Sequence, residues 1–130
     1  MGEMKIETVL TENAPKPAGH YSQAVVHNGL VFVAGQLAIK PNGERVLDSI
    51  EAQTEQAMAN VAAILRAASS DLSRLLKVTI YISDIELWGA VNQVYTRLMG
   101  EHRPARAVVP VKDLHYGFQI EIEAIAALNE

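Results

Sequence analysis

Three places in the chain carry side chains that could do chemistry. Tyr21 follows a glycine turn and would present a phenolic hydroxyl. Arg106 enters a predicted strand between small apolar residues, where its planar guanidinium could pair with an internal acid or bind a ligand carboxylate. Glu121 and Glu123 share one face of an otherwise apolar strand with Ile125. These residue types are suited to holding an anion and to moving a proton.

Each place also has a structural interpretation. Tyr21 could simply cap the edge of the core, and on an exposed edge the two glutamates would be solvated charges. In an interface they would need partners, because an unpaired buried carboxylate is costly, and Arg106 would be the natural one. The residues alone leave these alternatives open.

Several other chemistries lack their residues. The chain has no cysteine, which excludes disulfides, thiolate nucleophiles and Cys-ligated metals. No pair among its four histidines, His20, His27, His102 and His115, has metal-ligand spacing, so no metal site is predicted. No phosphate-binding glycine loop or serine-nucleophile motif occurs, so no cofactor is predicted.

Net charge and hydropathy limit the classes of partner and the cellular location that we expect for this chain. Eleven basic and fifteen acidic residues give a net charge of −4, which disfavours nucleic acid or an anionic membrane as a partner. The longest apolar run is far shorter than the roughly 18 residues of a membrane span. Residues 1–5 form no apolar leader, so a cytoplasmic location is expected.

Two periodicities alternate along the 130 residues and predict a single α+β domain, 1–130. Asp48 and Glu51 have the spacing of a capping box, with Asp48 as the N-cap of a first helix. Asp84 can cap a second helix. Asn28-Gly29 is typical of a hairpin turn. The predicted helices cover about 48–69 and 84–100; the predicted strands lie near 5–10, 22–27, 30–34, 76–82, 104–111 and 118–127.

Two helices can cover only one face of such a sheet. Yet residues 30–33 and 124–128 are apolar at consecutive positions, which is typical of strands buried on both faces. We therefore expect a homo-oligomer in which sheet faces pack together. The alternative is a partly exposed sheet, and large bare apolar patches are rare on monomers.

At this point the order of motifs resembles the RidA/YjgF family of reactive enamine/imine deaminases, over nearly the whole chain. Six motifs carry the resemblance: Ala14-Pro15, Gly19-x-Tyr21-x-Gln23, Val33-Ala34-Gly35-Gln36, Val91-Asn92-x-x-Tyr95, Arg103-Pro104-Ala105-Arg106 and Ile120-Glu121-Ile122-Glu123-Ala124-Ile125-Ala126. The last two are the most specific.

The resemblance implies a chorismate-mutase-like fold, a homotrimeric barrel with clefts between subunits, and hydrolysis of 2-aminoacrylate-type or 2-iminobutyrate-type acids to 2-keto acids and ammonia. It implies that Arg106 binds the substrate carboxylate, that Glu121 positions the attacking water and that Tyr21 belongs to the pocket. Gly35 would form part of the pocket wall, and Asn92 matches a motif residue whose role could be structural.

The chain departs from the family pattern at the pocket wall. Ala34 replaces a frequent serine, Val108 follows the arginine where a cysteine is common, and His115-Tyr116 replaces Pro-Lys. We count Ala34, Val108 and His115 among the expected substrate-binding residues. The new loop either reads a different substrate side chain or merely repacks the rim. Alternatives to a general deaminase are a dedicated catabolic deaminase of the 2-aminomuconate type and a non-catalytic trimer that binds small carboxylate metabolites.

Overall fold

The chain is described by a computed structural model that covers residues 5–130, so the leader prediction for residues 1–4 lies outside the described part. Within residues 5–130, no helix is both long and apolar enough to cross a bilayer. Two helices, six strands and three short 3-10 turns follow one another: β1 (Glu7–Val9), β2 (Ala24–His27), β3 (Leu30–Gln36), α1 (Ile50–Ala67), η1 (Leu72–Arg74), β4 (Leu75–Ile82), η2 (Ile85–Leu87), α2 (Trp88–Met99), β5 (Ala105–Pro110), η3 (His115–Gly117) and β6 (Ile120–Ala127).

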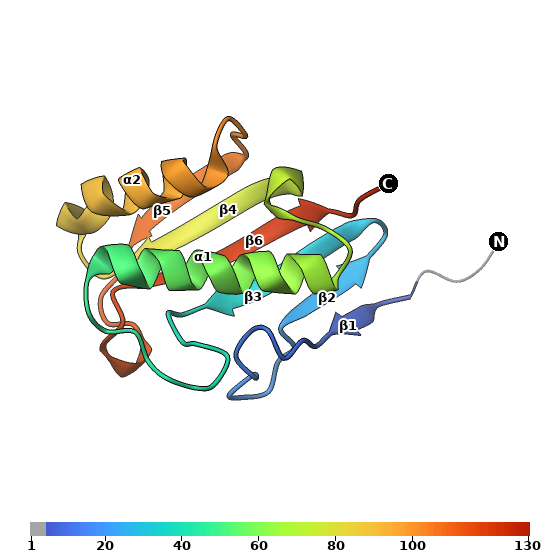
Figure 1. Ribbon diagram of the computed structural model, residues 1–130, viewed down its shortest axis with the longest axis horizontal. Helices are drawn as coiled ribbons and strands as arrows, with labels where there is room; N and C mark the ends of the chain where they lie inside the picture. Colours follow the sequence, from blue (N-terminus) through green and yellow to red (C-terminus); the bar gives the residue numbers. More distant parts are fainter. Residues whose placement is uncertain (1–4) are drawn as a thin grey trace.

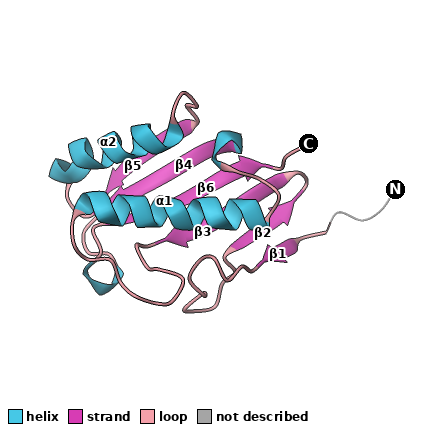
Figure 2. Cartoon of the chain, viewed as in Figure 1, coloured by secondary structure: helices cyan, strands magenta, loops and turns pink. Residues whose placement is uncertain are grey.

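The strands form one sheet in the order β1-β2-β3-β6-β4-β5. All neighbours are antiparallel except β4 and β5, which run parallel with α2 as their crossover. Both helices lie on the same face of the sheet (Figure 1). Figure 2 shows the resulting two layers, helices over strands. The prediction of a six-stranded mixed sheet with two helices on one face is confirmed.

The start of α1 differs from the prediction by one residue. Ser49, not Asp48, is the N-cap: its backbone is extended and its hydroxyl accepts a hydrogen bond from the backbone N–H of Ala52 at 3.0 Å. Aspartate and serine are comparable caps, so sequence does not separate them. Beginning the helix at Ile50 buries that side chain in the core. Asp84 does act as a cap, but for η2, from which α2 continues.

The core lies between the helices and the sheet. Alternate residues of β6 point into it, as predicted, and are almost fully buried: Ile120, Ile122, Ala124 and Ala126. The β2–β3 hairpin closes through Asn28 and Gly29, both with positive φ (52° and 80°), the geometry that a tight two-residue turn requires. At the centre of the sheet, β3 pairs with β2 on one side and with β6 on the other.

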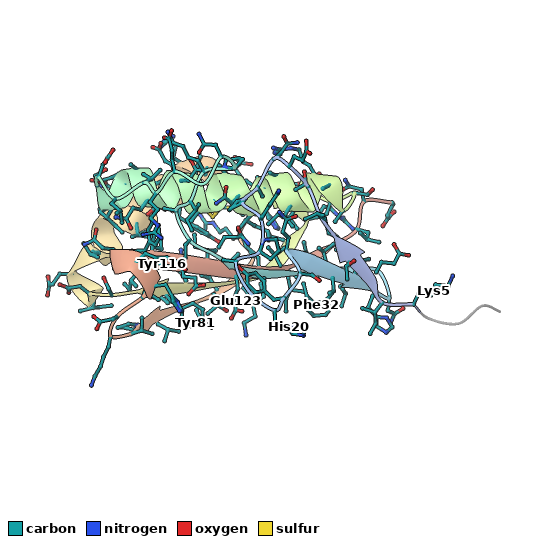
Figure 3. All side chains as sticks on the ribbon, turned by 90° about the horizontal axis from the view of Figure 1, so that it is seen from below. Lys5, His20, Phe32, Tyr81, Tyr116 and Glu123 are labelled. Carbon is teal, nitrogen blue, oxygen red and sulfur yellow. The ribbon has the colours of Figure 1, made fainter. Side chains whose placement is uncertain are left out.

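The opposite face, here called the open face, carries a mixed set of side chains. Figure 3 shows Phe32, Tyr81 and Glu123 on the side of the sheet away from the helices. Phe32 is 39% exposed and pairs in register with Ile125. The Tyr81 hydroxyl donates to Glu123 Oε1 at 2.6 Å. No element of residues 5–130 covers this apolar surface, so the expectation that something else must cover it stays a prediction.

Candidate functional site

The predicted site residues divide between two separate cavities. The larger, of about 410 Å³, is here called the Glu121 cavity. It is lined by five of the predicted residues: Tyr21, Ala34, Gly35, His115 and Glu121. The second, of about 370 Å³, is called the Arg106 cavity and contains Asn92 and Arg106. Val108 lines neither cavity and packs against the core.

Glu121 owes its position to a glycine. The strand β3 bulges between Val33 and Gln36, and the bulge brings Gly35 against the Glu121 side chain. A Cβ atom at position 35 would lie only 2.5 Å from Glu121 Oε2, so any other residue there would displace the carboxyl group. The absent side chain therefore creates the space in which the carboxyl group lies.

The surroundings of Glu121 make it a stronger base than an ordinary glutamate. Burial raises the pKa of its carboxyl group, and the negative charge of Glu123 raises this pKa further. His115 acts in the opposite direction, because its positive form favours the carboxylate. A half-buried carboxylate with a raised pKa is suited to accepting a proton from water.

The loop of residues 11–23 forms one wall of the Glu121 cavity, and Gln23 holds it. The Gln23 side chain is 1% exposed; its Oε1 accepts from the Thr11 N–H at 2.7 Å, and its Nε2 donates to the carbonyls of Thr11 and Pro15, both at 3.0 Å. Tyr21 extends from this wall, half exposed, with its hydroxyl accepting from the Ala18 N–H at 3.2 Å. Gln23 was a motif residue with no predicted role, and in the structure it holds the backbone of residues 11–15 in this wall.

The guanidinium of Arg106 lies over two aromatic rings. Its Cζ lies 4.6 Å from the centroid of the Trp88 ring and 5.1 Å from that of Tyr95. Its Nη1 donates to Asn92 Oδ1 at 3.1 Å. Within residues 5–130 no other hydrogen bond engages the guanidinium, so its remaining donors are free to bind a carboxylate. Asn92 thus orients the arginine.

Sequence reasoning missed Trp88, although a signal for it existed. Trp88, Asn92 and Tyr95 recur at i, i+4 and i+7 of α2, which places them on one face of the helix. The Tyr95 hydroxyl is buried without a partner among the described residues, and burial raises its pKa while Arg106 lowers it.

Arg106 and Glu121 do not meet within one chain. Arg106 is in register with Val78, which is buried under the helices, whereas Glu121 is in register with Tyr81 on the open face. The two side chains therefore leave the sheet on opposite faces. The expected pairing of Arg106 with the glutamates does not occur within a single chain, where Tyr81 is the partner of Glu123.

Metal ligands are sparse around these cavities. Among residues 5–130 no group of three histidine, aspartate or glutamate side chains is arranged to hold an ion. The ionisable side chains that line the two cavities are two guanidinium groups, one half-buried carboxyl group, three tyrosine hydroxyls, two imidazoles and one lysine ammonium group. Such a set can bind an organic acid and transfer protons.

Known proteins resemble this chain along nearly its whole length. A protein-family model described as Endoribonuclease L-PSP matches residues 11–128, which include every residue that lines either cavity. A RutC family protein of Pyrococcus horikoshii is 46% identical over 121 residues, 92% of this chain and 96% of the relative.

Two further relatives carry more specific names. A protein of Arabidopsis thaliana named Reactive Intermediate Deaminase A, chloroplastic, is 41% identical over 126 residues, which are 96% of this chain and 67% of that protein. The crystal structure of the YjgF gene product of E. coli matches with a TM-score of 0.89 at 36% identity, covering 95% of this chain and 99% of the other. The similarity therefore includes both sequence and fold.

Proposed function

The chain belongs to the RidA/YjgF family, and from that premise we propose that it is a hydrolytic deaminase of reactive enamines and imines. Its substrates would be small 2-imino acids of the 2-aminoacrylate or 2-iminobutyrate type, and its products 2-keto acids and ammonia. One observation carries the proposal. The chain has a guanidinium oriented by neighbouring side chains, that of Arg106, and a carboxyl group with a raised pKa, that of Glu121, and the two lie on opposite faces of one sheet.

Arg106 binds the substrate carboxylate in this mechanism. Its guanidinium lies near the rings of Trp88 and Tyr95, and its Nη1 donates to Asn92, so these contacts orient the arginine and leave its other donors for the substrate. A carboxylate held by two parallel N–H groups has a defined orientation, and the adjacent C=N bond is then aimed as well.

Glu121 accepts the proton of the attacking water. An iminium carbon is already electrophilic, so water attack needs orientation and a base rather than a covalent nucleophile. The raised pKa brings the carboxyl group closer to neutral pH, where a general base is most effective. Gly35 leaves the carboxyl group against the backbone, and Tyr21 closes the cavity beside it.

The complete site would form between copies of the chain in a homotrimer. Packing open faces against one another buries Phe32 and Ile125 and covers the apolar surface that the helices leave bare. β5, which carries Arg106, is an edge strand of the sheet and is available to a neighbouring copy. One copy then supplies Arg106 and the next supplies Glu121, and the partners are other copies and small imine acids.

The activity is tested by generating the imine in place. A pyridoxal-phosphate dehydratase in excess releases 2-aminoacrylate or 2-iminobutyrate, and keto-acid formation is followed with and without the protein. We expect acceleration over buffer, a loss of about 10- to 100-fold in kcat/KM for Arg106→Ala, and a loss of about 10²-fold or more in kcat for Glu121→Gln. Wild-type protein that gives no acceleration, or full activity in Arg106→Ala, refutes the proposal.

Substrate range separates the remaining activities. A panel of imines derived from small, bulky and dicarboxylic amino acids distinguishes a general deaminase from a dedicated one of the 2-aminomuconate type. Calorimetry showing tight keto-acid binding without turnover of any imine supports a binding protein instead. RNA cleavage that disappears in Glu121→Gln supports the activity named in the family description.

The shared site is tested by mixing two inactive variants. Arg106→Ala and Glu121→Gln are unfolded and refolded together, so that trimers contain both. In a ring of identical interfaces, about a quarter of the sites combine an intact arginine from one copy with an intact glutamate from the next. Recovery of about a quarter of wild-type activity supports the shared site, and no recovery in a refolded mixed trimer contradicts it.

A further inference from the structure

The turn η3 is held in an unusual conformation beside the Glu121 cavity. Tyr116 has φ 60° and ψ 17°, a left-handed backbone that a bulky side chain rarely adopts and that only surrounding contacts maintain. Both His115 and Tyr116 line the cavity. Strain at a cavity wall indicates that the turn positions a side chain there.

Two contacts fix the Tyr116 ring. The Arg45 guanidinium lies over one face, with Cζ 4.0 Å from the ring centroid. The ring also meets the edge of Phe118, at 6.3 Å between centroids and an interplanar angle of 87°, and Phe118 is 1% exposed. Arg45 is itself anchored by a backbone bridge to Ile39, another cavity residue. The Tyr116 ring, half exposed, therefore lies between the Arg45 guanidinium and the core residue Phe118, and we call this arrangement the clamp.

The clamp holds the neighbouring His115 at the cavity wall. The His115 ring lies 5.7 Å from that of Tyr116. His115 and Glu121 line the same cavity, where the positive form of His115 lowers the pKa of the Glu121 carboxyl group. The other ionisable side chains that line the cavity are Lys16 and Tyr21, both from the 11–23 loop and both exposed.

We propose that His115 is the proton donor to the departing nitrogen, working opposite Glu121 in the same cavity. The proposal rests on the proposed function, which assigns Glu121 but leaves the leaving group without an acid. Among the cavity's side-chain types, imidazole alone ordinarily titrates near neutral pH, which suits a group that must give and regain a proton. Arg45 and Tyr116 are positioning residues in this scheme.

The proton balance closes with these two groups. Water adds to the iminium carbon and Glu121 takes one of its protons, giving a neutral carbinolamine. The imidazolium of His115 protonates the carbinolamine nitrogen, the C–N bond breaks with its electron pair leaving on ammonia, and the hydroxyl proton returns to the imidazole. The proton on Glu121 then passes to ammonia, so keto acid and ammonium leave and both side chains are restored.

The test compares pH profiles of kcat, from about pH 5.5 to 8.5, with the dehydratase in excess and the buffer rate subtracted. We expect wild-type kcat to fall at alkaline pH as the imidazolium is lost. His115→Gln is expected to lose that alkaline limb and about 10²-fold in kcat. Arg45→Gln keeps the limb at a reduced kcat, because the donor remains but is less well placed. His27→Gln is the matched control: His27 lines no cavity described above, and it is expected to behave as wild type.

The outcomes separate this proposal from the one on which it rests. An active wild type together with an unchanged profile and kcat in His115→Gln overturns the role of His115 and leaves the deaminase intact. No acceleration by wild type overturns both. Thermal melting of each variant shows whether it is folded. If His115→Gln does not fold, Arg45→Gln provides the test. An Arg45→Gln variant with the full wild-type kcat and an unchanged alkaline limb overturns the positioning of His115.

Discussion

The close approach of Gly35 to Glu121 predicts that one added methyl group removes most of the activity without unfolding the protein. In Gly35→Ala the new Cβ would lie 2.5 Å from Glu121 Oε2, 3.0 Å from Cδ and 3.3 Å from Cγ. Ordinary contact between such atoms is about 3.5 Å, so the carboxyl oxygen must retreat by about 1 Å. Misplacement of a reacting group by that amount costs about 10²-fold in rate, or about 2.7 kcal/mol.

The stability of this variant should change little, for two reasons. The clash falls on the end of a flexible side chain, which relieves it by rotating, at about 1 kcal/mol for an off-rotamer torsion. The backbone at Gly35 is also not left-handed, so alanine fits it. We expect a melting temperature within about 5 °C of wild type.

The assay is keto-acid release in the coupled reaction, with Gly89→Ala as the control. Gly89 lies in α2, and a Cβ there meets nothing within 4 Å, so this variant should keep full activity. The double variant Gly35→Ala with Glu121→Gln should be no slower than Glu121→Gln alone, because both changes act on the same group. A folded Gly35→Ala with more than about a third of wild-type kcat refutes the reasoning, since a 1 Å shift is expected to cost about 10²-fold.

Three further predictions concern the supports of the site. Trp88→Leu removes the ring under Arg106 and should raise KM about 2- to 5-fold with kcat nearly unchanged in steady-state kinetics. Burial raises the pKa of Glu121, so the native state binds more protons than the unfolded state. The free energy of unfolding therefore falls as pH rises from the ordinary pKa of 4.5 through the raised pKa of the native state. Urea titrations at fixed protein concentration should show that Glu121→Gln is more stable than wild type at pH 7 but not at pH 4. Phe32→Glu places a charge on the open face, so sedimentation should show monomers for this variant, whereas we expect trimers for wild type.

The layers of the fold were predictable because buried and exposed positions alternate with a fixed period along each strand and helix, and the apolar residues follow that period. In β6 the buried residues Ile120 and Ile122 alternate with Glu121 and Glu123, so both the strand and its two faces follow from the residues alone. The start of α1 was not predictable to the residue, since adjacent Asp48 and Ser49 cap equally well and only the packing of the helix chooses between them.

Residues for the candidate site could be proposed from the sequence, but their geometry could not. Arg106 and Glu121 could be named, yet their placement on opposite faces depends on the register of β4 with both β5 and β6, which no local pattern encodes. The contact of Glu121 with Gly35 depends on a bulge in β3, and the clamp of Arg45 on Tyr116 joins two loops far apart in the chain. Such long-range pairings carry no sequence period.

The apolar open face and the divided site have a common explanation in assembly. The open face exposes Phe32 and no element of residues 5–130 covers it, and Arg106 and Glu121 leave the sheet on opposite faces, so a single chain completes neither the core nor the proposed site. In the proposed trimer, packing of the open faces would bury residues such as Phe32 and would bring β5, an edge strand of one copy, towards the next copy. Association would then complete the core and the site in the same step, so that a dissociated chain lacks activity even though every site residue keeps its local environment.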